Sequence, residues 1–134
     1  MEQYTLKPTG STPSVTFNSR NGTLNINGIS TPFDSLSFYG HIYNLLEQFD
    51  EIASDELNVN IALKKISNSQ AYLSILVKKL ISLTSQNRKV NINWYYENNN
   101  DEILTTGKDI SRYYDYPFNF KEVFKINYHL LQAS

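Results

Sequence analysis

Three stretches of the chain alternate apolar and polar residues with the period of two that is typical of β-strands, and this pattern constrains the fold most. They are residues 23–28, 57–64 and 90–96. Between them lie stretches with apolar residues at three- and four-residue steps, which is typical of amphipathic helices. A strand, a helix and a second strand in this order form a right-handed crossover between parallel strands. The sequence therefore predicts an α/β fold.

A β-hairpin is expected before the first helix. Residues 14–17 also alternate, and Asn21-Gly22 lies between them and residues 23–28. An Asn-Gly pair favours a hairpin turn because both residues tolerate positive φ. Residues 1–13 are polar and contain two prolines and a glycine, so we expect a flexible N-terminal arm there. Residues 14–134 are then expected to form a single domain, which fits the usual domain length of about 100–150 residues.

Three helices are expected to pack against the sheet. The first follows a cap at Asp34 or Ser35 and runs to about Ile52. The second has its cap at or next to Ser67 and runs to about Ser85, and the third covers residues 101–114. Their expected buried residues are Leu36, Tyr39, Ile42, Tyr43, Leu46 and Phe49, then Leu73, Leu76, Val77 and Leu80, then Ile103, Leu104 and Ile110. The tail from Phe118 is expected to form an edge strand or a final helix. The expected architecture is a small mixed sheet of about four strands with an N-terminal hairpin and packed helices.

Composition excludes several classes of function. The chain has 12 basic and 13 acidic residues, a formal net charge of −1 and no cysteine. A broad nucleic-acid surface needs clustered surplus cations, and disulfides and thiolate sites need cysteine, so none of these is expected. There is no apolar run of the roughly 18–20 residues that span a bilayer and no secretory signal, so the expectation is a soluble cytoplasmic protein without membrane contact.

The residues that carry catalysis are few. His41 and His129 lie far apart in the sequence, the glycines form no phosphate-binding motif, and no cluster has metal-ligand spacing. Glu97, Asp101 and Glu102 form the nearest acidic cluster, which we interpret as a solvated loop and helix start rather than a cation site. No cofactor and no metal are therefore expected, and a small enzyme is the least supported reading.

Two other features favour interaction over catalysis. The junction from Lys64 to Gln70 places the hydroxyls of Ser67 and Ser69 at a helix N-terminus, where the helix dipole favours phosphate. Ser67 and Gln70 also have capping-box spacing, so plain capping is the competing interpretation. The second feature is Trp94-Tyr95-Tyr96, in which we expect Trp94 to be buried and to anchor the second helix, while Tyr95 faces the other way.

The chain resembles the SiaC family of bacterial regulatory phosphoproteins over nearly all of its length from Thr12. The residues that carry the resemblance are Thr12-Pro13, Asn27-Gly28-Ile29-Ser30, Phe38-Tyr39, Trp94-Tyr95-Tyr96-Glu97, Gly107 and Pro117-Phe118. The most specific of them is the Trp-Tyr-Tyr-Glu strand end, with Gly107 ten residues beyond Glu97. The resemblance implies a fold similar to the anti-sigma-factor antagonist (STAS-type) domain and a non-enzymatic switch.

The resemblance also implies protein partners. In the family, a kinase phosphorylates the threonine of an Asn-Thr-Ser-Ser junction, a PP2C-type phosphatase removes the phosphate, and the unmodified form activates a diguanylate cyclase, which links such proteins to biofilm regulation. Aligned without gaps, this threonine falls on Ile66, which has no hydroxyl. Either the acceptor has moved to Ser67, with Ser69 as second choice, or the chain is a constitutive binding module. Lys65, Asn68 and Tyr95 are the candidate partner-surface residues.

Overall fold

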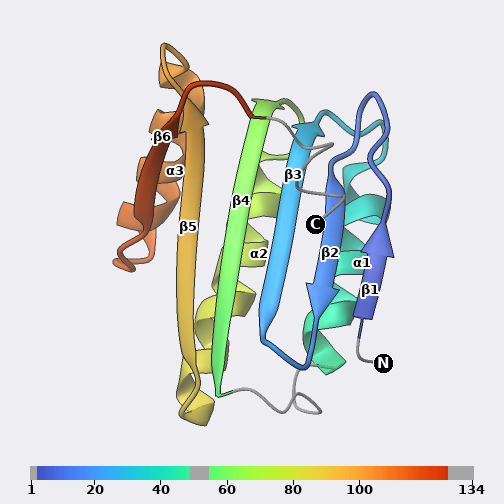
Figure 1. Ribbon diagram of the computed structural model, residues 1–134, viewed down its shortest axis with the longest axis vertical. Helices are drawn as coiled ribbons and strands as arrows, with labels where there is room; N and C mark the ends of the chain where they lie inside the picture. The colour runs from blue at the N-terminus through green and yellow to red at the C-terminus, as the bar shows by residue number, and fades with distance from the viewer. Residues whose placement is uncertain (1–2, 49–54, 127–134) are drawn as a thin grey trace.

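A mixed sheet of six strands forms the body of the molecule in the computed structural model, which describes residues 3–48 and 55–126 (Figure 1). The strands lie side by side in chain order. The first three pair antiparallel, and every later neighbour pair is parallel. The strands are β1 (Gln3–Leu6), β2 (Ser14–Asn18), β3 (Thr23–Ser30), β4 (Glu56–Ile66), β5 (Lys89–Glu97) and β6 (Asn119–Val123).

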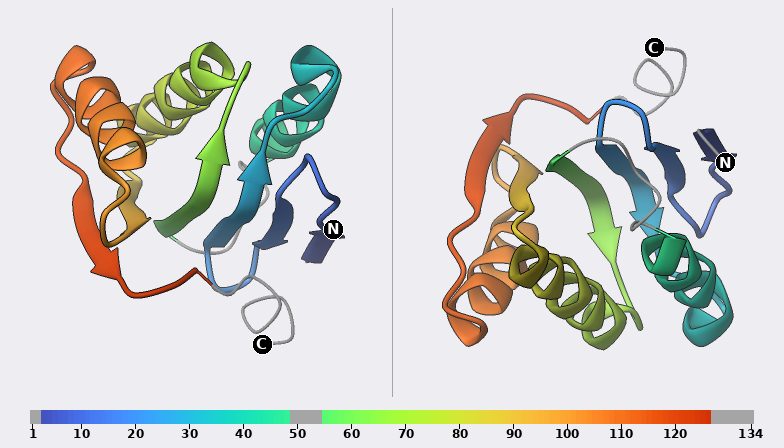
Figure 2. Two further views of the ribbon diagram at one scale, coloured as in Figure 1. Left: turned by 90° about the horizontal axis from the view of Figure 1, so that it is seen from above. Right: turned by 90° about the horizontal axis from the view of Figure 1, so that it is seen from below.

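Among the described residues, the helices all cover the same face of this sheet and none lies on the other face (Figure 2). They are α1 (Ser35–Glu47), α2 (Gln70–Ser82) and α3 (Asp101–Tyr113), and the short 3₁₀ helix η2 (Leu83–Gln86) extends α2. Asp34 caps α1 by accepting a hydrogen bond from the Ser37 backbone N–H, as the sequence predicts. Within the described residues, no helix combines the length and the apolar character needed to cross a membrane.

The α/β fold, the hairpin, the parallel crossovers and the three helices are confirmed, but the strand count of about four is wrong. The count lacks two edge strands, of which the first was missed and the second is one of the two alternatives expected for the tail. Residues 3–6, expected as part of a flexible arm, pair with β2 as strand β1. The start of the tail is an edge strand, β6, which pairs with β5. Both strands are short and bury little surface, so their sequences carry weak alternation.

The core lies between the sheet and the helices. The odd-numbered residues of β4 from Leu57 to Leu63 are buried there, as are the four predicted residues of α2. The register shifts next to Gly28, so that β4 carries one extra residue at Lys64. Because of this bulge, Ile66 is buried in the core while Lys65 is exposed. Leu36, expected on the buried face of α1, is instead 65% exposed, and Phe49 lies outside the described residues.

Trp94 is fully buried, as predicted, and it packs against α3, while its expected role in anchoring α2 stays a prediction. Its indole Nε1 donates a hydrogen bond to the Ile103 carbonyl at 3.0 Å. Its ring stacks on Phe118 at a centroid distance of 6.0 Å. A Cβ atom at Gly107 of α3 would lie 2.6 Å from the indole. Gly107 therefore permits the close approach of α3 to β5.

Two helix-interior glycines allow a matched test of this contact. Gly107→Ala is expected to lower the free energy of unfolding by about 1–3 kcal/mol, because the new methyl group overlaps a rigid ring. Gly40→Ala in α1 is expected to raise it by about 0.5–1 kcal/mol, because alanine favours the helix, and its Cβ would meet nothing within 4 Å. Urea unfolding measures both. Equal effects of the two substitutions would contradict the close contact at Gly107.

The face of the sheet without helices carries a ladder of side-chain hydrogen bonds across five strands. Each amide Nδ2 donates to the next residue: Asn119 to Asn93, Asn93 to Asn60, Asn60 to Asn25, and Asn25 to the Thr16 hydroxyl. The distances are 3.1, 2.9, 2.8 and 3.1 Å in that order. These residues are directly opposite one another in the strand register. The ladder therefore fixes the register of the sheet.

Removing a residue from the middle of the ladder is expected to lower the free energy of unfolding more than removing one at its end. Asn60→Ala breaks one donated and one accepted bond and should lower the free energy of unfolding by about 1–2 kcal/mol. Asn119→Ala removes a single bond at an exposed position and should change it by less than about 0.5 kcal/mol. Chemical denaturation of both variants tests this order, and a larger effect for Asn119→Ala would refute it.

Candidate functional site

Three loops meet at the edge of the sheet where the parallel strands end, and they contain the predicted phosphoacceptor serines (Figure 1). The loops connect β3 to α1, β4 to α2 and β5 to α3. The Ser35 hydroxyl donates to the Asn68 carbonyl at 2.5 Å, and Asn100 Nδ2 donates to the Lys64 carbonyl at 3.1 Å. The β4–α2 loop is thus tied to the first residue of α1, and the β5–α3 loop is tied to the end of β4.

Ser67 is the first residue after β4 and is half-exposed. Its backbone N–H donates to the Ser30 carbonyl at 2.9 Å, which extends the pairing of β3 and β4 by one residue. Asn68 follows with φ of 59°, a left-handed conformation that asparagine tolerates. The predicted place of Ser67 at or next to the helix N-cap is wrong, because α2 begins at Gln70 and its cap residue is Ser69, two residues after Ser67.

Ser69 is fully buried, and its side chain does not cap α2. Its hydroxyl instead lies 2.9 Å from both the Ser30 hydroxyl and the Ser30 carbonyl, and 3.3 Å from the Ser67 carbonyl. The predicted capping box between Ser67 and Gln70 is absent because Gln70 is the first residue of α2, and its side chain accepts from the Ser69 backbone N–H at 3.2 Å instead. A hydroxyl with no exposed surface is not accessible to a kinase, which argues against Ser69 as the second-choice acceptor.

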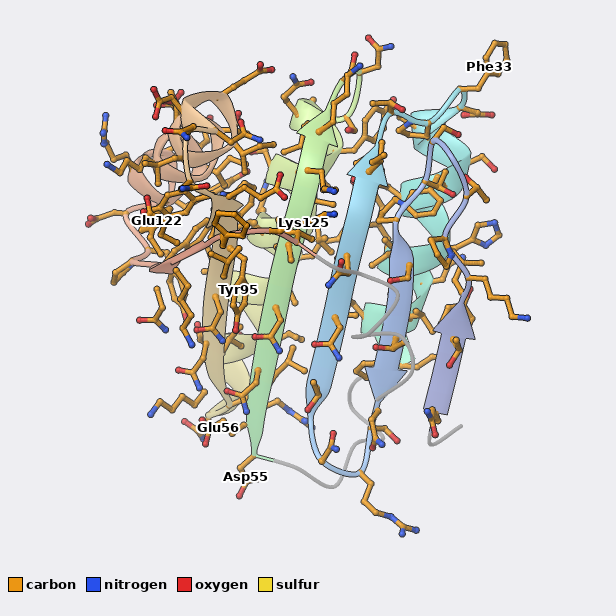
Figure 3. All side chains as sticks on the ribbon, turned by 45° about the horizontal axis from the view of Figure 1, so that its top comes forward. Phe33, Asp55, Glu56, Tyr95, Glu122 and Lys125 are labelled. Carbon is orange, nitrogen blue, oxygen red and sulfur yellow. The ribbon has the colours of Figure 1, made fainter. Side chains whose placement is uncertain are left out.

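The candidate partner-surface residues do not all lie together. Lys65 and Asn68 are exposed at the loop edge. Tyr95 lies on the sheet face without helices, half-buried, with the Lys121 ammonium 5.6 Å from its ring centroid (Figure 3). Tyr95 and Trp94 therefore face opposite sides, as the alternation predicts. Lys64 lies 4.0 Å from the Glu97 carboxylate.

Sequence reasoning missed four residues at this edge. Phe33 is fully exposed and extends beyond the ends of the strands, and Leu36 in the first turn of α1 is also exposed (Figure 3). Ser30 and Tyr39 are fully buried below the loop. Burial raises the pKa of Tyr39, so its hydroxyl stays protonated at physiological pH. The local sequence predicts only a helix cap at Asp34 or Ser35, and nothing in it distinguishes an exposed Leu36 from a buried one.

The other candidate groups do not converge on a site. His41 is exposed on α1, and His129 lies outside the described residues. Asp101 and Glu102 are exposed in the first turn of α3, where acidic residues favour the helix dipole. Glu97 accepts from the Ile126 backbone N–H at 2.9 Å. Among residues 3–48 and 55–126, no group of three or more His, Asp or Glu side chains is placed to hold a metal ion.

Comparison with known proteins identifies relatives over almost the whole chain. An uncharacterised protein of Pseudomonas aeruginosa strain UCBPP-PA14 is 22% identical over 119 residues, covering 88% of this chain and 94% of that protein. The crystal structure of apo-SiaC from Pseudomonas aeruginosa superposes with a TM-score of 0.75 at 20% identity, covering 91% of this chain and 98% of that one.

A second structure contains SiaC with a partner. In the complex of the diguanylate cyclase SiaD with its activator SiaC, also from Pseudomonas aeruginosa, the matched chain gives a TM-score of 0.79 at 20% identity, covering 90% of this chain and 99% of that one. These likenesses establish a shared fold. The model of the SiaC family regulatory phosphoproteins matches residues 6–123, which confirms the resemblance stated above. The chain belongs to the SiaC family of regulatory phosphoproteins.

Proposed function

We propose that this chain is a non-enzymatic interaction module switched by phosphorylation of Ser67, and that its unmodified form binds and activates a diguanylate cyclase. A kinase and a PP2C-type phosphatase would set the level of the phosphate. Membership of a family of regulatory phosphoproteins supports the switch. The shared fold with SiaC, which is described as the activator of a diguanylate cyclase, supports the choice of effector.

The observation that carries the proposal is the accessibility of one hydroxyl in the β4–α2 loop. Ile66 has no hydroxyl and is buried in the core. Ser69 is fully buried and hydrogen-bonded to Ser30. Ser67 lies between them and is half-exposed, and no hydrogen bond from its hydroxyl is found in the described residues. Ser67 is therefore the loop hydroxyl that a kinase can reach.

The surroundings of Ser67 suit a phosphate. The first turn of α2 contains no acidic residue and no side-chain cap, so its N–H groups remain free to favour a nearby anion. Lys65 is exposed two residues away. Lys64 is already close to Glu97, so it offers less screening. These groups stabilise the phosphate without cancelling its charge of about −2.

The expected effect of the phosphate is local. Lys65, Asn68, Phe33 and Leu36 are exposed at the same edge, and large exposed apolar side chains are typical of protein interfaces. A dianion at Ser67 would block or repel a partner that docks on these residues. Tyr95 lies on the sheet face without helices and not at this edge. It is a candidate contact for a separate partner, because tyrosines are enriched at protein interfaces.

Phosphoryl transfer from radiolabelled ATP by the kinase of the same organism tests the acceptor. We expect the wild type to be labelled. Ser37→Ala is the control, because Ser37 is an exposed serine at the same edge, and it should be labelled as well. Ser67→Ala should lose the label. Since Ser67 is not the cap residue, its substitution should change the free energy of unfolding by less than about 0.5 kcal/mol. Label that persists on the Ser67→Ala, Ser69→Ala double variant would refute the assignment.

A constitutive binding module is the second candidate, and Ile66 at the family's expected acceptor position favours it. In that case the same surface would bind its partner without regulation. Absence of label on the wild type, together with cyclase binding by the same preparation, would support this alternative and reject the switch.

A further inference from the structure

Three hydroxyl groups beneath the Ser67 loop form a fully buried chain of hydrogen bonds. Ser30, Tyr39 and Ser69 each have no exposed surface. The Tyr39 hydroxyl lies 2.5 Å from the Ser30 hydroxyl, which lies 2.9 Å from that of Ser69. Ser69 in turn donates to the Ser30 carbonyl at 2.9 Å. A buried hydroxyl without a hydrogen-bond partner lowers the stability of the fold, so three buried hydroxyls at one place depend on one another for partners.

Counting donors and acceptors shows that all three hydroxyl protons can be used within this group. The Tyr39 hydroxyl has its hydrogen-bonding partners among the serine hydroxyls. If it donates to Ser30, then Ser30 donates to Ser69 and Ser69 donates to the Ser30 carbonyl, so all three protons are used. The three buried hydroxyls therefore satisfy one another and the Ser30 carbonyl.

The end of this chain holds the loop that carries Ser67. The Ser30 carbonyl accepts from both the Ser69 hydroxyl and the Ser67 backbone N–H. The Ser69 hydroxyl also lies 3.3 Å from the Ser67 carbonyl. On its outer side, the loop is bonded to Ser35 through the Asn68 carbonyl. Ser67 is thus fixed on both sides through its backbone, while its side chain takes no part in the chain of hydroxyls.

We infer that Tyr39, Ser30 and Ser69 are positioning residues, a buried hydroxyl chain that presents Ser67 in one conformation to the enzymes that modify it. This inference rests on the proposed function of Ser67. A fixed backbone lowers the entropy cost of binding in an active site, so loss of the chain should slow phosphoryl transfer to an otherwise unchanged serine.

Two tyrosines of α1 provide a matched test. Tyr39→Phe removes the first hydroxyl and keeps the ring, which stacks on Tyr72 at a centroid distance of 6.1 Å. Tyr43→Phe removes a hydroxyl one turn later, which donates at 2.7 Å to the Tyr72 carbonyl in α2 rather than to the loop. Amide hydrogen exchange by NMR reports the Ser67 N–H directly. We expect Tyr39→Phe to accelerate exchange at Ser67 at least tenfold more than at Val59 and Ile61, and Tyr43→Phe to show no such local effect.

Unchanged exchange at Ser67 in Tyr39→Phe, or equal acceleration at all three amides, would overturn the inference, since the second result means only a general loss of stability. Phosphorylation kinetics provide the second arm: Tyr39→Phe should lower kcat/KM for transfer to Ser67 at least fivefold, and Tyr43→Phe should not. A wild type that accepts no phosphate at Ser67 would reject the proposed function, whereas the exchange result would still decide whether the chain positions the loop.

Discussion

Replacing Trp94 by alanine is expected to lower the free energy of unfolding by about 3–5 kcal/mol, the range found when large core side chains are removed. Trp94 is fully buried in the centre of β5. Its removal would leave a cavity between Phe118 and Gly107, which has no side chain to fill it. It would also leave the Ile103 carbonyl without its indole partner. Urea unfolding followed by circular dichroism measures the change.

Trp94→Phe separates packing from hydrogen bonding at the same position. Phenylalanine keeps most of the apolar contact but cannot donate to Ile103, so we expect an intermediate loss of about 1–3 kcal/mol. A free energy of unfolding equal to that of the wild type in Trp94→Ala would contradict the packing of β5 against α3 described above.

Ser67→Glu is expected to weaken binding to the cyclase at least tenfold, a change of about 1.4 kcal/mol. The substitution places a negative charge at the loop edge, next to the exposed residue Asn68 in the sequence. The circular dichroism spectrum and thermal unfolding should stay unchanged, because Ser67 is half-exposed and outside both β4 and α2. Titration calorimetry with a diguanylate cyclase of the same organism measures the affinity.

Asn44→Glu is the control for charge alone. Asn44 is exposed on α1, about two helical turns beyond Leu36 and away from the Ser67 edge. We expect its affinity for the cyclase to stay within threefold of the wild type, on the order of 0.6 kcal/mol. Equal weakening by both substitutions would mean that the effect is general electrostatic repulsion. Unchanged affinity in a folded Ser67→Glu would remove the Ser67 edge from the mechanism.

The central part of the fold could be predicted because its residues alternate strictly between core and surface. The pattern from Leu57 to Leu63 identified β4, and that from Val90 to Trp94 identified β5. The edge strand β1 could not be found in this way, and for β6 the pattern allows either a strand or a helix. β1 has only four residues, each exposed or half-exposed, so tertiary pairing rather than local pattern decides its conformation.

The candidate site was predicted less completely, because its geometry depends on contacts distant in sequence. Local spacing placed the cap of α2 at Ser67, but the actual cap residue, Ser69, is held by Ser30, 39 residues earlier. Likewise, the alternation of β5 predicts that Trp94 is buried but does not say which helix covers it. The glycine at position 107 decides this, since a larger residue would keep α3 away from the indole.

Residue-level phosphate mapping tests the central claim most directly. The protein is purified from its native organism and analysed by tandem mass spectrometry, before and after treatment with a PP2C-type phosphatase. The account predicts one phosphate on Ser67 that the phosphatase removes, with the buried Ser69 unmodified. A phosphate on Ser69 or on a residue outside the β4–α2 loop, with Ser67 always unmodified, would contradict it.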